Sequence, residues 1–188
     1  MNVYDFDGTI YDGDSTVDFY LYCVKKHPSI LRFFPKQCWG FLRYYLKRID
    51  ITRMKENFFC FLKAVDSEKI LPDFWDLHEK NIFKWYYDNH LEDDIIISAS
   101  PEFLLAPICE RLGIKNMMAS RVDSKTGKFA SPNCRSEEKV KRLYEKYGKV
   151  HIDNFYSDSE KDLPLARLAD KAFYIKKGEV TNWNLDIH

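Results

Sequence analysis

Two aspartates one residue apart follow a short apolar segment at the start of the chain. Residues 2–6 have the composition of a buried strand, and Asp5 and Asp7 stand at its carboxyl end, followed by Gly8. Strand side chains alternate between faces, so the two carboxylates can share one pocket only if the backbone turns sharply, which Gly8 permits. Crowded carboxylates are costly unless a cation, a proton or a reaction offsets their repulsion. The pattern indicates a chemical site, with an ordinary Asp-Gly turn as the alternative.

Two serines follow a second apolar run. Residues 94–98 read as a strand covered on both faces, and Ser98 ends it. Ser100 and Pro101 have the composition of a helix N-cap and first helical position. A hydroxyl beside the free amides of a helix start can hold a phosphate, whereas simple capping by both serines is the alternative.

Lys139 and a pair of aspartates supply the remaining candidates. Lys139 is predicted to lie in the first turn of a helix that Ser136 caps, where the helix dipole opposes a cation and indicates a nearby anion. Asp158 ends a later strand, and Asp162 follows one helical turn on, so both carboxylates can face one crevice. The alternatives are a solvated surface lysine and an acidic helix start without function.

The order of these pieces resembles the four motifs of the haloacid dehalogenase superfamily of hydrolases. The matching residues are Asp5-x-Asp7-Gly8-Thr9, Ser98, Lys139 and Asp158-x-x-x-Asp162. The long separation between the first two motifs resembles that in the phosphoserine phosphatase-like subgroup. In that subgroup a helical cap is inserted after the first strand. The resemblance implies a phosphatase that uses Mg2+.

The resemblance also implies a role for each matching residue. Asp5 would be the nucleophile that forms an aspartyl-phosphate, and Asp7 the general acid and base. The implied phosphate-binding residues are Ser98, Ala99, Ser100 and Lys139. The implied Mg2+ ligands are Asp5, the backbone carbonyl of Asp7, and Asp158, with Asp162 supporting the metal site or the lysine.

Two departures from the subgroup bear on the substrate. Ala99 and Ser100 follow Ser98 where the subgroup often has two glycines, and Lys161 stands where phosphoserine phosphatases usually carry asparagine. These changes weaken the case for phosphoserine. The expected substrate is therefore a small phosphorylated metabolite or a lipid phosphate. A phosphotransferase on the same scaffold, or a non-catalytic phosphate-binding regulatory module, is the alternative function.

The order of apolar segments predicts an α/β fold, a Rossmann-like doubly wound parallel sheet with the site at the carboxyl ends of its strands. The expected strands are residues 2–6, 94–98, 117–120, 152–156 and 172–176. A small hairpin is expected at 121–130. Residues 14–85 carry helical patterns, which predicts a small all-helical cap domain inserted into a core domain of residues 1–13 and 86–188.

Composition excludes several classes of protein. The 188 residues carry 29 basic and 29 acidic side chains, so no global field favours nucleic acid. The five cysteines are scattered and odd in number, which favours reduced thiols in a cytoplasmic protein. No signal peptide and no bilayer-spanning apolar run are recognisable. No obligate protein partner is evident.

Charge in the predicted cap is uneven. Residues 25–63 hold ten basic and two acidic side chains, interleaved with aromatic residues. Helical spacing predicts that Trp39, Leu42 and Leu46 face inward, which leaves other aromatics outside. Such a surface can bind an anionic membrane or a large anionic substrate, which would place the protein peripherally at the inner membrane face. The alternative is a small cap whose aromatics pack on one another beneath solvated lysines.

Overall fold

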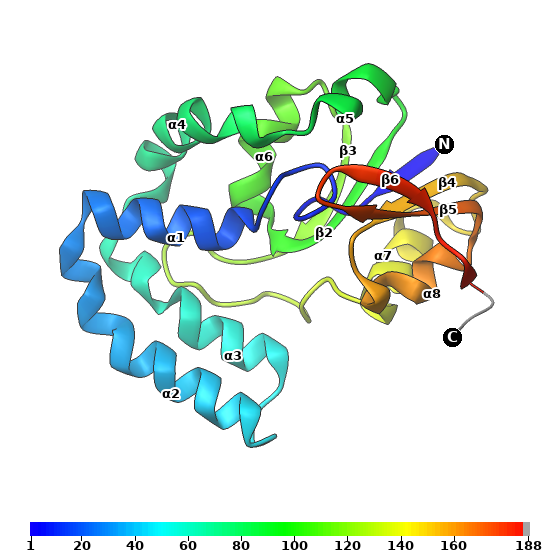
Figure 1. Ribbon diagram of the computed structural model, residues 1–188. Coiled ribbons are helices and arrows are strands. Elements are labelled where there is room, and N and C mark those ends of the chain that lie inside the picture. Colours follow the sequence, from blue (N-terminus) through cyan, green and yellow to red (C-terminus); the bar gives the residue numbers. More distant parts are fainter. Residues whose placement is uncertain (186–188) are drawn as a thin grey trace.

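The sheet of the computed structural model, which describes residues 1–185, has six strands with helices on both faces (Figure 1). Their order across the sheet is β3-β2-β1-β4-β5-β6. The strands are β1 (Asn2–Tyr4), β2 (Ile95–Pro101), β3 (Asn116–Ser120), β4 (Ile152–Ser157), β5 (Ala169–Lys176) and β6 (Glu179–Asn182). Neighbouring strands are parallel except β5 and β6. This mostly parallel sheet confirms the predicted α/β class.

The two faces of the sheet pack into separate hydrophobic clusters. Along β1, Val3 enters one cluster and Tyr4 the other, because strand side chains alternate between faces. The Tyr4 face is covered by α4 (Ser67–His78), α5 (Lys84–Asn89) and α6 (Glu102–Arg111). The Val3 face is covered by α7 (Glu137–Tyr147) and α8 (Leu163–Ala166). The fold is therefore doubly wound, as predicted.

The chain between β1 and β2 is helical, as expected. Some of its helices project away from the sheet, and the others pack on it. Helices α1 (Ser15–Lys26), α2 (Phe34–Tyr45) and α3 (Ile51–Phe58) project to one side of the sheet (Figure 1). Helices α4 and α5 instead lie on the sheet, where Trp75 and Tyr86 share the cluster of Tyr4. The indole Nε1 of Trp75 donates to the Leu104 carbonyl of α6 at 2.8 Å. The division into a cap of residues 14–85 and a core stays a proposal.

Three local expectations differ from the structure. Strand β1 ends at Tyr4 because the Phe6 carbonyl accepts the amides of Ile10 and Tyr11 in a tight turn. The segment 121–130 closes through a single antiparallel bridge between Val122 and Phe129 in place of two strands. Strand β6 was not predicted, because all four of its residues are exposed and show no apolar alternation.

Helix α2 presents the opposite face from the predicted one. Trp39, Leu42 and Leu46 are exposed, so their expected burial is wrong. Gln37 and Gly40 are buried instead. A Cβ at Gly40 would lie 2.5 Å from Asn57 of α3, so glycine allows the two helices to pack closely.

No helix within residues 1–185 combines the length and the apolar character needed to cross a membrane.

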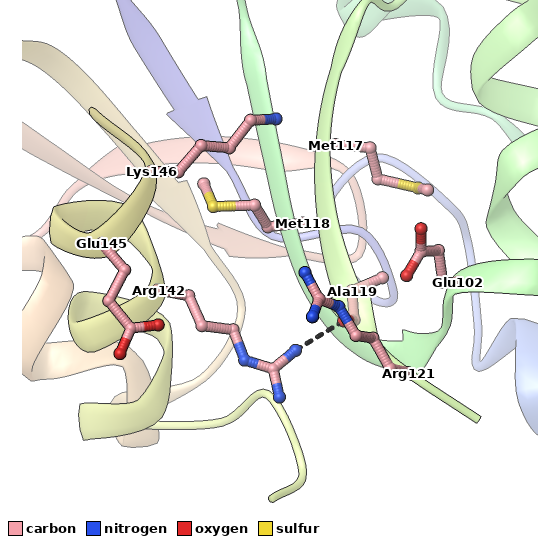
Figure 2. Close-up of a pocket in the computed structure, with 8 residues that line it drawn as sticks. All are labelled: Glu102, Met117, Met118, Ala119, Arg121, Arg142, Glu145 and Lys146. Atoms are coloured by element: carbon pink, nitrogen blue, oxygen red, sulfur yellow. Dashed lines mark hydrogen bonds between the residues drawn. The ribbon is translucent and has the colours of Figure 1, made fainter. Parts of the chain in front are cut away.

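A single arginine anchors the loop between β3 and α7. Arg142 donates to the Ala119 carbonyl at 2.6 Å and to the Ser131 hydroxyl at 2.8 Å, and it also binds the Pro132 carbonyl. Figure 2 shows the first of these bonds in a cavity between α7 and β3, with Glu102 across from it. The guanidinium thereby fixes the chain that leads into α7.

We expect Trp75→Ala to lower the free energy of unfolding by about 3–5 kcal/mol, because it removes a fully buried indole and leaves a cavity between α4, α6 and the sheet. Urea denaturation measures the change. Trp39→Ala, at an exposed tryptophan, is the matched control and should stay within about 0.5 kcal/mol of the parent. Equal losses in the two variants would contradict the packing described.

Candidate active site

Lys139 is the centre of a buried ion-pair group. Its Nζ lies 2.9 Å from Asp5 Oδ1 and 2.6 Å from Asp162 Oδ2. The Ser157 hydroxyl donates to the same Asp162 oxygen at 2.9 Å. The Asp5 amide donates to the Tyr156 carbonyl at 2.9 Å, which fixes Asp5 at the carboxyl end of β1. The lysine side chain is only 2% exposed, so a solvated surface lysine is excluded.

Burial and charge act in opposite directions on this group. Burial raises the pKa of Asp5, and the neighbouring Lys139 ammonium partly reverses that rise. For Lys139, burial alone would lower the pKa, but Asp5 and Asp162 outweigh it and raise the pKa. The lysine therefore stays charged at neutral pH and holds Asp5 as its partner.

Asp7 is held by one residue of α1 and one residue of β2. Its Oδ1 accepts the Ser15 amide at 2.7 Å, and its Oδ2 accepts the Ser100 hydroxyl. The Ser100 hydroxyl also lies 3.0 Å from the Thr16 hydroxyl of α1. Burial first, and then the charge of Asp14, raise the pKa of Asp7 to about 6, although the bonds from Ser100 and Ser15 lower it. A carboxyl with such a pKa can give and take a proton near neutral pH.

The segment around Ser98 differs in part from the prediction. Strand β2 runs on to Pro101, and α6 begins at Glu102 without a side-chain cap, so Ser100 is not the helix cap expected. Ser98 is buried, and its hydroxyl accepts the Ser100 amide at 3.1 Å. The structure thus brings Ser98, Ala99 and Ser100 to the site, with the Ser100 hydroxyl turned to Asp7.

Asp158 lies directly against the first turn. A Cβ at Gly8, whose φ is +71°, would lie 2.1 Å from Asp158 Oδ2, so only glycine permits this approach. The Thr9 hydroxyl accepts the Asp158 amide at 3.0 Å. Burial raises the pKa of Asp158. After it, the chain forms a 3-10 turn (Glu160–Asp162) and then the short α8, so Asp158 and Asp162 are not separated by the α-helical turn expected from their spacing.

The donor set fits a hard divalent cation. Asp5 and Asp162 contact the buried Lys139 ammonium, Asp158 lies against Gly8, and Asp7 follows Asp5 by two residues. Excess negative charge in a buried site is costly unless a cation offsets it. Carboxylate and carbonyl oxygens are the ligands that Mg2+ prefers. The residues present therefore suit Mg2+.

Lys55 of α3 is a site residue that the sequence did not reveal. Its Nζ donates to the Ala99 carbonyl at 2.8 Å and to Asn133 Oδ1 at 2.9 Å. Burial lowers the pKa of Lys55 to about 8. Asn133, which binds Lys55, and Ser15, which binds Asp7, each have one buried side-chain atom without a hydrogen-bond partner within residues 1–185, Nδ2 and Oγ respectively. No sequence motif or spacing distinguishes Lys55 from the other basic residues of 25–63.

Known proteins resemble this chain in sequence or in fold. The family model for haloacid dehalogenase-like hydrolases matches residues 3–167. A histidinol-phosphatase of Neisseria meningitidis serogroup C is 25% identical and covers 91% of this chain and 87% of its own length. A solved protein of unknown function from Bordetella pertussis Tohama I has a TM-score of 0.72 at 18% identity, covering 92% of this chain and 87% of that one. A phosphoserine phosphohydrolase-like protein from Francisella tularensis has a TM-score of 0.55 at 16% identity, covering 92% and 86%.

Removal of the buried ammonium should destabilise the fold. We expect Lys139→Met to cost about 3–5 kcal/mol at pH 8 in the presence of a chelator, because it leaves buried carboxylates unpaired. The unpaired Asp5 binds its proton more strongly in the folded state, so stability rises as the pH falls through its folded-state pKa. The loss measured by urea denaturation should therefore be smaller at pH 5.

The matched control is Lys141→Met, which removes an exposed lysine of the same helix and should change stability by less than about 0.5 kcal/mol. A loss for Lys139→Met that is equal at both pH values would be inconsistent with an ionic role.

Proposed function

This chain belongs to the haloacid dehalogenase-like hydrolases, and on that premise we propose that it is a Mg2+-dependent phosphatase that hydrolyses a phosphate monoester through an aspartyl-phosphate on Asp5. One observation carries the proposal. Lys139 binds one oxygen of the partly buried Asp5 carboxylate, and the pKa of the second carboxyl, Asp7, is raised to about 6. The kinship with a histidinol-phosphatase supports hydrolysis of a phosphate ester.

In the first step, Asp5 attacks phosphorus and the bond to the leaving oxygen breaks. Lys139 holds Asp5 in position through Oδ1. Asp7 gives its proton to the leaving alkoxide, which departs as an alcohol. In the second step, Asp7 takes a proton from water, the water oxygen attacks the phosphorus, and the acyl phosphate bond breaks. Phosphate leaves and Asp5 returns as a carboxylate.

Charge on the transferring phosphoryl group is shared among donors of the chain. Ser98, the Ala99 amide, Ser100 and Lys139 would bind its oxygens, because positioning and charge neutralisation dominate this chemistry. Asp162 keeps Lys139 in place. Mg2+, held by Asp5, the Asp7 carbonyl and Asp158, would offset the repulsion between nucleophile and phosphate.

The substrate is the least specified part of the proposal. A small phosphorylated metabolite or a lipid phosphate fits this chemistry, in a cytoplasmic enzyme that meets a membrane only peripherally. Transfer of the phosphoryl group to an acceptor other than water would use the same residues. A non-catalytic phosphate-binding module is less favoured, since the sequence contains every residue that the proposed reaction needs. A screen of phosphorylated metabolites and lipid phosphates, with and without Mg2+, distinguishes these cases.

Asp5→Asn should reduce turnover of a generic phosphate monoester such as p-nitrophenyl phosphate by at least about 1,000-fold, because the amide is a poor nucleophile. The variant should still fold, as circular dichroism would show, because Asp162 remains paired with Lys139. Asp93→Asn, at an exposed aspartate, is the control and should keep full activity. Retained turnover in Asp5→Asn would overturn the assignment.

Mg2+ should stabilise the fold through Asp158. A ligand at about 100 times its dissociation constant adds about 2.7 kcal/mol, which raises the melting temperature of a chain of this size by several degrees. We expect that rise for the parent, its reversal by a chelator, and its loss in Asp158→Asn. Asp93→Asn, at an exposed aspartate that is not grouped with other metal-ligating side chains of residues 1–185, should keep the full shift. The same shift in both variants would remove Asp158 from the metal site.

A further inference from the structure

The outward side of α2 is apolar along its whole length. Residues spaced three and four apart share one side of a helix. The side opposite Gln37 and Gly40 carries only apolar residues, and Leu46, just past the helix end, continues it. We call this surface the outer face of α2: Phe34, Pro35, Cys38, Trp39, Leu42, Tyr45 and Leu46, all exposed. A surface helix ordinarily has the reverse arrangement, with polar residues outside.

Contacts on the inner side hold α2 in this orientation. Gln37 accepts the Tyr20 hydroxyl at 2.8 Å and donates to the Phe58 carbonyl at 2.9 Å. Gly40 lies against Asn57 with no room for a side chain. Rotation of α2 to bury Trp39 would break both contacts. The apolar residues therefore face outward because of how the helix packs.

Basic side chains surround the outer face. Exposed Arg32 precedes α2, and exposed Lys36 lies beside the outer face within the helix. Exposed Lys47 and Arg48 follow the helix. Within residues 1–185, none of these four forms an ion pair with an acidic side chain. The two acidic residues of 25–63 are engaged on α3, since Asp50 accepts the Arg53 amide and Glu56 pairs with Arg53.

We propose that the outer face of α2 docks on a bilayer surface rich in anionic phospholipid. Trp39, Leu42 and Tyr45 would enter the headgroup region while the surrounding lysines and arginines pair with lipid phosphates. Large exposed apolar patches mark interaction surfaces, and the basic rim selects an anionic one. A second copy of the chain is a poor occupant, because two segments with ten basic and two acidic residues each would face one another.

Docking in this way leaves the catalytic residues uncovered by lipid. Figure 1 shows α3 between α2 and the sheet, and Lys55 of α3 is the residue that reaches the site. The bilayer would contact the projecting helices, while Asp5 stays at the end of β1. The inference does not depend on the proposed function, since binding needs none of the catalytic residues.

Co-sedimentation with vesicles tests the proposal. The protein should bind vesicles of phosphatidylglycerol and phosphatidylcholine at low salt, should not bind pure phosphatidylcholine, and should release at high salt. Trp39→Ala/Leu42→Ala should weaken binding by about tenfold or more, since it removes apolar side chains that enter the interface. Leu77→Ala/Leu91→Ala, at leucines of 55% and 56% exposure elsewhere, should bind like the parent.

The contribution of charge is tested by reversal. Lys36→Glu/Arg48→Glu should weaken binding by about tenfold or more, whereas Lys80→Glu/Lys84→Glu, an equal change at exposed lysines of the other side, should have little effect. Melting temperatures close to that of the parent would show that each variant is folded. Asp5→Asn should bind vesicles like the parent whether or not the catalytic proposal holds.

Three results would overturn the proposal. One is no binding to anionic vesicles at low salt. Another is binding that Trp39→Ala/Leu42→Ala leaves unchanged. The third is a dimer, seen by light scattering and abolished by that variant, in a protein that does not bind lipid, which would assign the outer face of α2 to a second copy.

Discussion

A single buried ammonium holds the site together. Lys139 bridges Asp5 at the end of β1 and Asp162 beyond the end of β4, so α7, β1 and β4 meet at one atom. Neither the lysine nor its carboxylates would be tolerated inside the protein without the others. The strand order brings the other motif residues together, because β1 lies between β2 and β4 and the carboxyl ends of these parallel strands lie at one edge of the sheet. Gly8 then lets Asp158 approach the first turn.

The inserted helices complete this site and also contribute to the core. Ser15 at the start of α1 binds Asp7, and Lys55 of α3 reaches the carbonyl of Ala99. Farther along, Trp75 packs into the sheet with residues of β1. Movement of the projecting helices would therefore change the surroundings of Asp7 and Ala99 while α4 stays on the sheet.

The sequence allowed prediction of the motif residues because each stands where a strand or helix begins or ends, positions that apolar patterns mark well. It failed where two packings satisfy the same pattern. Ser100 has the composition of a helix cap, yet tertiary contact with Asp7 takes its hydroxyl. Trp39 and Leu42 fit a buried stripe, yet Gly40 determines which face of α2 meets α3. Lys55 could not be recognised, because only long-range folding separates it from other lysines.

Detection of the covalent intermediate is the most direct test of the account. The protein is mixed with a phosphate monoester labelled in its phosphoryl group, quenched in acid and digested, and the labelled peptide is identified by mass spectrometry. The account predicts an acyl phosphate on Asp5. With p-nitrophenyl phosphate, whose leaving group departs without a proton from Asp7, it predicts a larger amount in Asp7→Asn, where water is no longer activated for the second step. Turnover without label on the protein, or label on a different residue, would contradict it.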